Sequence, residues 1–253
     1  MVAETEDGTG NRRDQVSGEG QVPSKDRAGP ASISLEEALA TTRAMRRLEP
    51  DPVPLDVLAR VVEAATMAPT GSYAENWRFF VVTDREIIGR LGELWGQLHG
   101  MVEEHARSVL PEAIFRSVVY LGRHFGDSPA VVFVGGTGAP PPGAPLPMTA
   151  TWYGSLFPAV QNLMLAARSF GLGTTLTTLV LAFHDQVREL LGAPEDVTLV
   201  ACIPMGYPKG RFARPARRPV REVAYLNRHG NPLPDPGSDV SVGPASPSPG
   251  PGE

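Results

Sequence analysis

The 253-residue sequence contains a single cysteine, Cys202, and this scarcity excludes an intrachain disulfide framework and any multi-cysteine metal site. Cys202 lies in the apolar run 197–203, which indicates a small buried side chain rather than a nucleophile. Basic residues are not in excess either, because the net charge is -5 and the pI is about 5.6. We therefore expect no nucleic-acid partner, since proteins that bind nucleic acids usually carry a basic surplus.

Long apolar runs are also missing. No run reaches the roughly 18 residues that a membrane-spanning helix needs, and the N-terminus has no apolar signal-peptide core. These absences predict a cytoplasmic protein with no membrane association. The histidines show no metal-ligand spacing, so we expect no metal; they are His99, His105, His124, His184 and His229.

Large apolar side chains are almost absent from residues 1–30, and residues 231–253 are rich in proline, serine and glycine. Such segments bury too little apolar surface to offset the entropy of ordering. The sequence predicts two disordered tails, 1–30 and 231–253, around one ordered domain, 31–230.

Within that domain, the apolar patterns alternate irregularly between helical and strand periods. Ser34 with Glu37 is typical of a capping box, Asp84 of an N-cap and Gly171 of a left-handed C-cap. Helices are expected over 35–42, 55–65, 86–99, 101–123 with a break near Pro111, 156–170 and 184–191, strands over 78–83, 130–134 and 198–204, and a short loop or strand over 174–178. This mixed order predicts an α+β or three-layer α/β/α fold.

Several short motifs follow one another in a characteristic order. They are Arg43-Ala44-Met45-Arg46-Arg47, the runs 63–71, 77–82, 160–163 and 171–174, and Pro204-Met205-Gly206-Tyr207-Pro208. Each motif is weak alone, but over residues 35–230 their order and spacing resemble the nitroreductase family of FMN-dependent oxidoreductases. The resemblance implies a central mixed, mostly antiparallel sheet and a homodimer with FMN at the subunit interface. It also implies a C-terminal segment that crosses to the partner.

The residues by themselves support less than this. The expected helix at 156–167 is apolar on a broad face and needs another surface to cover it. A second subunit and the core of a monomer satisfy that need equally well.

The resemblance assigns the FMN phosphate to Arg43, whose planar fork can donate two charge-assisted hydrogen bonds. Thr42 stands where the family often has a second basic residue, so Arg217 and Arg218 would carry more of the phosphate. Arg46 matches the position near flavin N1 and O2, where a cation stabilises the reduced ring. Without the family, an ordinary solvated surface would be the favoured interpretation of both arginine clusters. The implied cofactor-binding residues are Arg43, Ala44, Met45, Arg46, Arg47, Pro69, Thr70, Gly71, Ser72, Tyr73, Thr174, Thr175, Leu176, Thr177, Arg217 and Arg218.

Two loops would contact the flavin. The loop 69–72 matches the segment that wraps the ribityl chain, and the loop 171–177 matches the one that points a backbone N–H at N5. The chain departs from the family at Tyr73 and Glu75, which replace neutral amides and are possible substrate-side groups. A separate NAD-binding domain is not predicted, because the Gly-Leu-Gly-Thr turn is not a dinucleotide fingerprint.

The resemblance implies that hydride passes from NADH or NADPH through flavin N5 to an organic acceptor such as a nitroaromatic or a quinone. The flavin carries the chemistry, so no protein nucleophile is needed. The implied substrate pocket contains Phe115, Tyr120, His124 and Phe125. Two alternatives stay open: a pathway-specific flavin dehydrogenase or oxidase, which Tyr73 and Glu75 suggest, and a non-enzymatic FMN-binding protein, which the thin phosphate cluster suggests.

Overall fold

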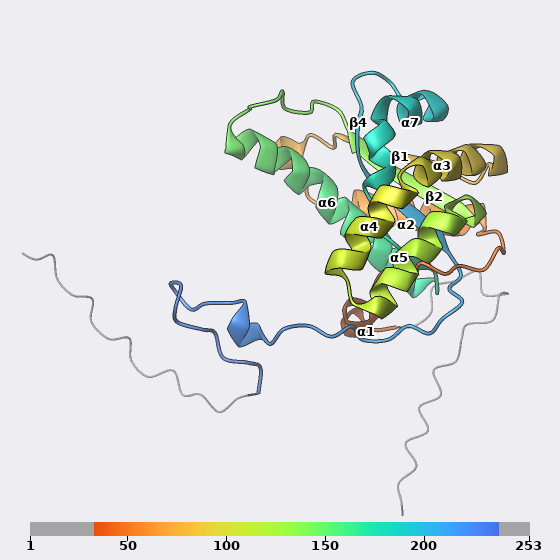
Figure 1. The fold of residues 1–253 in the computed structure, drawn as a ribbon. Coiled ribbons are helices and arrows are strands. Elements are labelled where there is room, and N and C mark those ends of the chain that lie inside the picture. The colour runs from red at the N-terminus through yellow and green to blue at the C-terminus, as the bar shows by residue number, and fades with distance from the viewer. Residues whose placement is uncertain (1–32, 238–253) are drawn as a thin grey trace, which may run out of the picture. The chain divides into compact units, whose positions relative to one another are not determined.

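The computed structural model describes residues 33–237 (Figure 1). The chain divides after Ala213 into two compact units, whose described parts are residues 33–213 and 214–237. The predicted tail at 1–30 and most of the one at 231–253 lie outside the described residues, so the tail boundaries stay predictions. No helix in the described part is long and apolar enough to cross a membrane.

The first unit is built on a four-stranded sheet in the order β1-β2-β4-β3. All three neighbouring pairs in this sheet are antiparallel. A parallel pairing occurs at one isolated bridge, between Ala44 and Thr174. The strands are β1 (Trp77–Val82), β2 (Ala130–Gly136), β3 (Gly173–Thr174) and β4 (Thr198–Gly206). The three long strands were expected to within two residues at each end, and the segment 174–178 contributes only its first residue to a strand.

The helices are fixed by local signals that the sequence already carries. The Asp84 carboxylate accepts hydrogen bonds from the backbone N–H groups of Glu86 and Ile87, at 2.8 and 3.1 Å. Ser34 caps its helix in the same way, but Glu37 pairs with Arg168 instead of completing the expected capping box. The helices of the first unit are α1 (Leu35–Thr41), α2 (Leu55–Thr66), α3 (Arg85–Gln97), α4 (His99–Val109), α5 (Glu112–His124), α6 (Leu146–Ser169) and α7 (His184–Leu191).

Helix α6 is longer than expected. It begins at Leu146, ten residues before the predicted start at Leu156. The two prolines at its start, Pro145 at the N-cap and Pro147 in the first turn, suit positions where backbone N–H groups have no partner. Thr149, Thr151, Gly154 and Ser155 interrupt the apolar periodicity of the first half of the helix, which is why the sequence pattern placed the start too late. The helix ends at Ser169, and Gly171 adopts the expected left-handed conformation with φ 75°.

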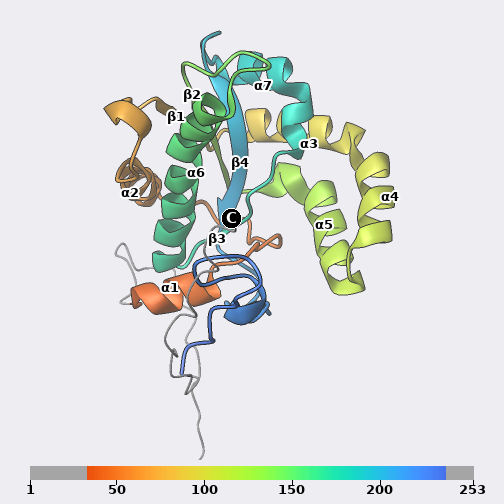
Figure 2. The ribbon, with the colours of Figure 1, turned by 90° about the vertical axis from the view of Figure 1, so that its left-hand side faces the viewer.

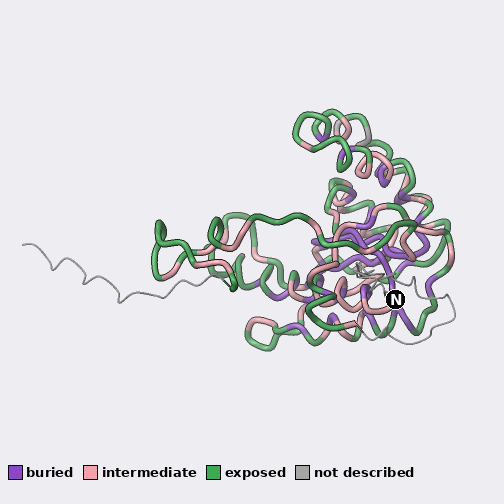
Figure 3. The backbone as a smooth tube through the Cα atoms, turned by 90° about the horizontal axis from the view of Figure 1, so that it is seen from below, coloured by how far each residue is buried: buried purple, intermediate pink, exposed green. Residues whose placement is uncertain are grey.

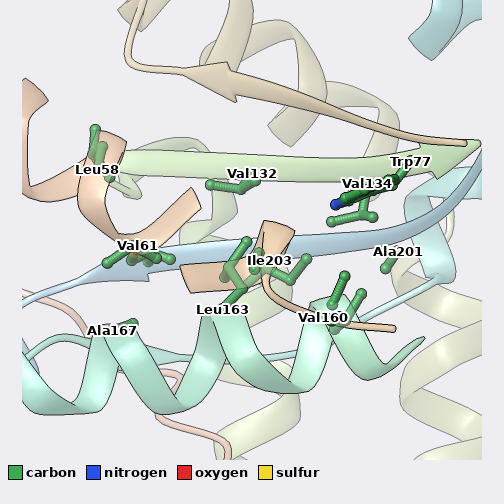
Figure 4. Packing of buried hydrophobic residues seen from close by; sticks show 14 of the residues in the cluster. Leu58, Val61, Trp77, Val132, Val134, Val160, Leu163, Ala167, Ala201 and Ile203 are labelled. Atoms are coloured by element: carbon green, nitrogen blue, oxygen red, sulfur yellow. The ribbon is translucent and has the colours of Figure 1, made fainter. Parts of the chain in front are cut away.

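The expected three-layer α/β/α arrangement is confirmed, because the sheet buries both faces (Figure 2). Helices α2 and α6 cover one face, and α3, α5 and α7 cover the other. Alternate residues of β2 point to opposite sides, with Val132 in the first core and Phe133 in the second. Figure 4 shows the first core, in which Val61 of α2 and Leu163 of α6 meet Ile203 of β4. Figure 3 shows that the buried stretches of this unit gather around the strands.

A bulge in the centre of the sheet sets which residues face which core. The register between β2 and β4 shifts between Val134 and Gly135, so Val200 has no Cα partner in the ladder. Beyond this shift Cys202 points into the second core, where it is fully buried. This burial confirms the reading of a buried side chain, and it raises the pKa of the Cys202 thiol well above its ordinary value.

The second unit, residues 214–237, contains the short 3₁₀ helix Val220–Glu222. Tyr225 and Pro232 form an antiparallel bridge, and Arg221 is ion-paired with Asp235. The backbone and side-chain hydrogen bonds and the charge of Arg221 hold the pKa of Asp235 below its usual value. Residues 231–237 are thus bonded to the turn before them.

The close approach of α3 to the turn before β2 gives a stability prediction. A Cβ at Gly92 would lie 2.9 Å from the backbone of Gly126, whereas a Cβ at Gly89 of the same helix meets nothing within 4 Å. We expect Gly92→Ala to lower the free energy of unfolding by about 1–3 kcal/mol, because backbone cannot move aside as a side chain can. Gly89→Ala should raise it by about 0.5–1 kcal/mol through helix propensity. Urea denaturation of both variants checks this, and equal midpoints would contradict it.

Candidate active site

The arginine-rich segment 43–49 lies beside the edge strand β3 and is hydrogen-bonded to Thr174 at its end. Met45 donates its N–H to the Thr174 carbonyl at 2.8 Å, and the Thr175 hydroxyl donates to the Met45 carbonyl at 3.0 Å. Both threonines are buried. The contact requires Gly173, because a Cβ there would lie 2.7 Å from the Cβ of Met45. These contacts therefore fix the position of the segment relative to the edge of the sheet.

The same segment then pairs with the residues that follow β4. Leu48 and Pro208 form an antiparallel bridge. Glu49 donates its N–H to the Tyr207 carbonyl at 2.7 Å, and Lys209 donates its N–H to the Arg47 carbonyl at 2.9 Å. This short ladder places Lys209 beside the arginines although it lies 160 residues further along the chain.

Arg168, near the end of α6, forms hydrogen bonds with α1, the helix that leads into the segment. Its guanidinium donates to Glu37 Oε1 at 3.1 Å and to the Thr41 hydroxyl at 2.9 Å, and it lies 3.9 Å from the Phe212 ring centroid. Burial lowers the pKa of Arg168, an effect that the negative charge of Glu37 opposes. Because Glu37 and Thr41 belong to α1, these bonds fix the end of the helix two residues before Arg43.

The positive charges of this segment are not neutralised. No carboxylate in the described chain forms an ion pair with Arg43 or Arg46. Arg43 donates from Nη2 to the Arg211 carbonyl at 3.0 Å, and its buried Nε has no hydrogen-bond partner. Burial lowers the pKa of Arg46, and the nearby charge of Arg43 lowers it further. Such a cluster is suited to bind an anion, because the anion would supply the missing partners.

Two cavities meet at these side chains. One, of about 530 Å³, is lined by residues 43–47 together with Ser117, Tyr120, Lys209 and Gly210. The other, of about 650 Å³, lies against Arg46, Tyr120 and Lys209 and extends towards the C-terminal end of α5. Both volumes are in the range of small-molecule and cofactor sites. The three shared side chains form the boundary between the two cavities.

The loop after α2 is strained and exposed. Ser72 and Tyr73 both have φ 54°, and Glu75 has φ 42°. Left-handed conformations cost free energy in residues with a Cβ, and they persist where the surroundings enforce them. Here the Gly71 N–H donates to the Ser155 hydroxyl of α6 at 2.9 Å, and Tyr73 is 96% exposed. The loop thus presents Tyr73 and Glu75 outward from the surface of α6.

The model of one protein family, described as "Nitroreductase family", matches residues 39–207, which is more than half of the chain. The chain belongs to the nitroreductase family. An iodotyrosine deiodinase from Nematostella vectensis is 23% identical over 226 residues, covering 81% of this chain and 80% of the relative. A protein from Methanothermobacter thermautotrophicus, provisionally named NADH dehydrogenase/NAD(P)H nitroreductase, is 28% identical over 181 residues, covering 70% and 79%.

The fold is likewise shared with solved structures. The FMN-dependent nitroreductase NfnB from Mycobacterium smegmatis, solved in complex with NADPH, superposes with a TM-score of 0.59. The alignment covers 76% of this chain and 97% of that one at 22% identity, a level that supports the fold alone. The nitroreductase-like fold expected from the sequence is therefore confirmed.

The structure brings together only part of the cofactor set that the family resemblance implies. The segment 43–47 and the residues Thr174 and Thr175 are joined by hydrogen bonds, and Leu176 beside them is 40% exposed. The N–H groups of Thr175 and Thr177 are bonded to β4 carbonyls. The loop Pro69–Tyr73 lines neither of the two cavities. Arg217 and Arg218 are exposed and lie in the second unit, so their part in a phosphate site stays a prediction.

The four expected substrate-pocket residues separate into two pairs. Tyr120 and His124 line the larger cavity, and their rings stack 4.2 Å apart. Phe125 is fully buried and stacks on Trp95 at 5.0 Å, so it is a core residue and the expectation that it lines a pocket is wrong. Phe115 is 6% exposed and is covered by Arg107, 4.4 Å from its ring centroid, so it lines neither cavity. Helical spacing puts Tyr120 and His124 on one face of α5, which the sequence reading did not use.

Sequence reasoning missed three charged residues of the site: Arg85, Asp127 and Lys209. All three line the larger cavity. Arg85 and Asp127 follow an N-cap and a helix end, where charged residues are common on any surface. Lys209 follows the last strand by three residues, and only its pairing with Arg47 reveals its place. No local pattern distinguishes these residues from solvated ones.

The bond between Thr175 and Met45 gives a prediction about the integrity of the site. Thr175→Val removes the buried donor and leaves the Met45 carbonyl without it, so we expect the free energy of unfolding to fall by about 1–3 kcal/mol. Thr178→Val is the control, because Thr178 is exposed and its change should stay within about 0.5 kcal/mol. Chemical denaturation measures both, and a Thr175 variant as stable as the control would refute the role of this bond.

Proposed function

We propose that this nitroreductase-family chain is an FMN-dependent oxidoreductase that passes hydride from NADH or NADPH to an organic acceptor such as a nitroaromatic or a quinone. The observation that carries the proposal is the pair of unneutralised guanidiniums, Arg43 and Arg46, which both line the cavity of the segment 43–47, with Arg46 also lining the larger cavity. FMN supplies an anionic phosphate and a flat ring with an electron-rich edge, and both suit such a pair. The similarity to NfnB, an FMN-dependent nitroreductase solved in complex with NADPH, supports the same cofactor and donor.

The residues present fit the phosphate of FMN. The Arg43 guanidinium is already oriented by the Arg211 carbonyl, which leaves its buried Nε free to donate. Arg46 is half-buried, so its charge acts at lower effective dielectric than a charge in water. We assign Arg43 to the phosphate and Arg46 to the ring edge, and the backbone of residues 174–176 to one side of the ring. When bound, FMN supplies hydride acceptance and donation at N5.

A second candidate function is reductive deiodination. The deiodinase from Nematostella vectensis aligns over four fifths of both chains, and this similarity favours a halogenated phenol as an alternative acceptor. Tyr73 and Glu75 are exposed in the strained loop where the chain departs from the family pattern, so a changed acceptor is consistent with them.

We further propose that the active form is a homodimer. Leu146, Tyr153 and Phe157 lie seven and four residues apart, on one face of α6, and are 78, 42 and 37% exposed. An apolar stripe of this kind on a long helix is typical of an interface. Tyr73 is almost fully exposed in the loop that is bonded to the same helix through Ser155. A second copy covering α6 would bring its own loop 69–73 towards a flavin, which explains why that loop lines neither cavity within one chain.

The reaction class is tested by visible spectroscopy of the purified protein loaded with FMN. We expect NADH or NADPH to bleach the flavin under anaerobic conditions, and a nitroaromatic or quinone to restore its colour. Release of iodide from 3-iodo-L-tyrosine by the reduced protein would select the deiodinase instead. Bleaching only by another organic compound would indicate a dehydrogenase or oxidase, and a bound flavin that nothing reduces would indicate a binding protein. A protein that takes up no FMN would refute all of these.

The role of the guanidiniums is tested on the same material. Arg43→Met should weaken FMN binding by about 10- to 100-fold, the loss expected for charge-assisted hydrogen bonds. Without FMN the variant should unfold at no lower temperature than the wild type, because it removes the positive charge that repels Arg46. Arg60→Met on the exposed side of α2 is the matched control and should leave both quantities unchanged. Equal FMN affinity in the Arg43 and Arg60 variants would contradict the assignment.

The dimer is tested by size-exclusion chromatography with light scattering. We expect twice the mass of the 27.0 kDa chain. Phe157→Glu should raise the dimer dissociation constant by about 30-fold or more, because it places an unpaired charge in an apolar interface. Leu55→Glu, at a 72% exposed position of α2, is the control. A monomeric wild type, or a Phe157 variant that dimerises as well as the control, would exclude this interface.

A further inference from the structure

The larger of the two cavities carries features that FMN binding does not explain. It lies on the other side of Arg46 from the cavity of the segment 43–47, and its apolar wall includes Pro50, Val53 and Leu121. Its volume of about 650 Å³ is ample for a small aromatic molecule. An apolar wall with a few convergent polar groups is the usual composition of a ligand site.

The charges around this cavity are predominantly positive. Arg46, Arg85 and Lys209 line it, whereas Asp127 is the only carboxylate among its described lining residues. The Asp127 carboxylate lies 2.8 Å from Nδ1 of His124, within hydrogen-bond distance.

Arg85 remains an uncompensated cation although its geometry is fixed. It donates to the carbonyls of Gly126 and Ser128 at 2.6 and 2.5 Å, and these neutral acceptors orient the guanidinium without cancelling its charge. Lys209 is positioned by its backbone bond to Arg47, and no carboxylate of the described chain forms an ion pair with it. The cavity therefore combines an apolar wall with preorganised positive charge, which favours an anionic ligand over a neutral one.

Tyr120 and His124 place two aromatic rings in the lining of the cavity. The two rings stack at 4.2 Å with 23° between their planes, and the Arg47 guanidinium lies 4.7 Å from the Tyr120 centroid. This stacking fixes both rings, and a fixed aromatic side favours a planar ligand.

We propose that this cavity binds the anionic group of a small aromatic ligand, a carboxylate or a phosphate, beside the flavin. The charge and the shape of the cavity carry the proposal, and its position beside the flavin rests on the proposed function. The anion belongs either to the acceptor or to the 2′-phosphate of NADPH. The two sources share one chemistry and are separated by kinetics.

Equilibrium binding tests the proposal without requiring turnover. Benzoate and benzamide have nearly the same shape and differ in charge, and their dissociation constants are measured by calorimetry on the FMN-loaded protein. We expect benzoate to bind about tenfold more tightly than benzamide. Equal affinities, or no binding of benzoate, would overturn the proposal.

Two substitutions of opposite sign locate the site. Thr83 is exposed and lines the cavity, so Thr83→Glu should weaken benzoate binding by about tenfold, while the matched Thr83→Gln should leave it unchanged. Asp127→Asn removes the carboxylate and should strengthen benzoate binding severalfold. Since loss of folding cannot strengthen binding, the second variant protects the test against misfolding. If Thr83→Glu and Thr83→Gln behave alike and Asp127→Asn has no effect, the cavity is not the site.

Steady-state kinetics then identifies the source of the anion. If Thr83→Glu raises KM for 4-nitrobenzoate but not for 4-nitrobenzamide, the anion belongs to the acceptor. If it raises KM for NADPH but not for NADH, the anion is the 2′-phosphate of the donor. A variant that changes none of these constants contradicts the placement beside the flavin. Failure of the proposed function is distinct, because it shows as absence of bound FMN or of NAD(P)H oxidation, whatever the benzoate affinity.

Discussion

The site depends on the attachment of one extended segment, residues 43–49, to the corner of the sheet where β3 pairs with the end of β4. Backbone bonds to Thr174, Tyr207 and Lys209 hold it, and Gly173 permits the close approach. Arg168 fixes the helix that leads into it. Because main-chain groups make most of these bonds, the position of the segment is largely independent of its side chains. The arginine side chains are therefore not needed to hold the segment in place.

The electrostatics of this segment oppose the stability of the ligand-free protein. Arg43 and Arg46 repel one another, burial disfavours the charge of Arg46, and the buried Nε of Arg43 lacks a partner. An anion bound here, as proposed above, would offset these penalties, so part of the free energy of folding would be exchanged for affinity. This exchange is typical of binding sites, which are seldom the most stable parts of a fold.

The sequence predicted the strands and most helix ends, because caps such as Asp84 and fully apolar strands are local signals. It missed the first ten residues of α6, where polar residues interrupt the apolar pattern. In the site, it predicted the arginines but not Lys209, whose neighbour Arg47 is remote in sequence and joined only by the ladder after β4. It also misread Phe125, since aromatic residues serve cores and pockets alike, and burial is a property of the whole fold.

The single cysteine of the chain, Cys202, is shielded from reagents in solution. Cys202 sits in the middle of β4 with no accessible surface, and its raised pKa keeps the thiol protonated. Oxidation and alkylation require the thiolate and access to it. A flavoprotein whose reduced cofactor meets oxygen generates peroxide at its own surface. If this chain carries FMN as proposed, that peroxide would meet no accessible cysteine, so self-inactivation by thiol oxidation would be closed as long as the sheet stays folded.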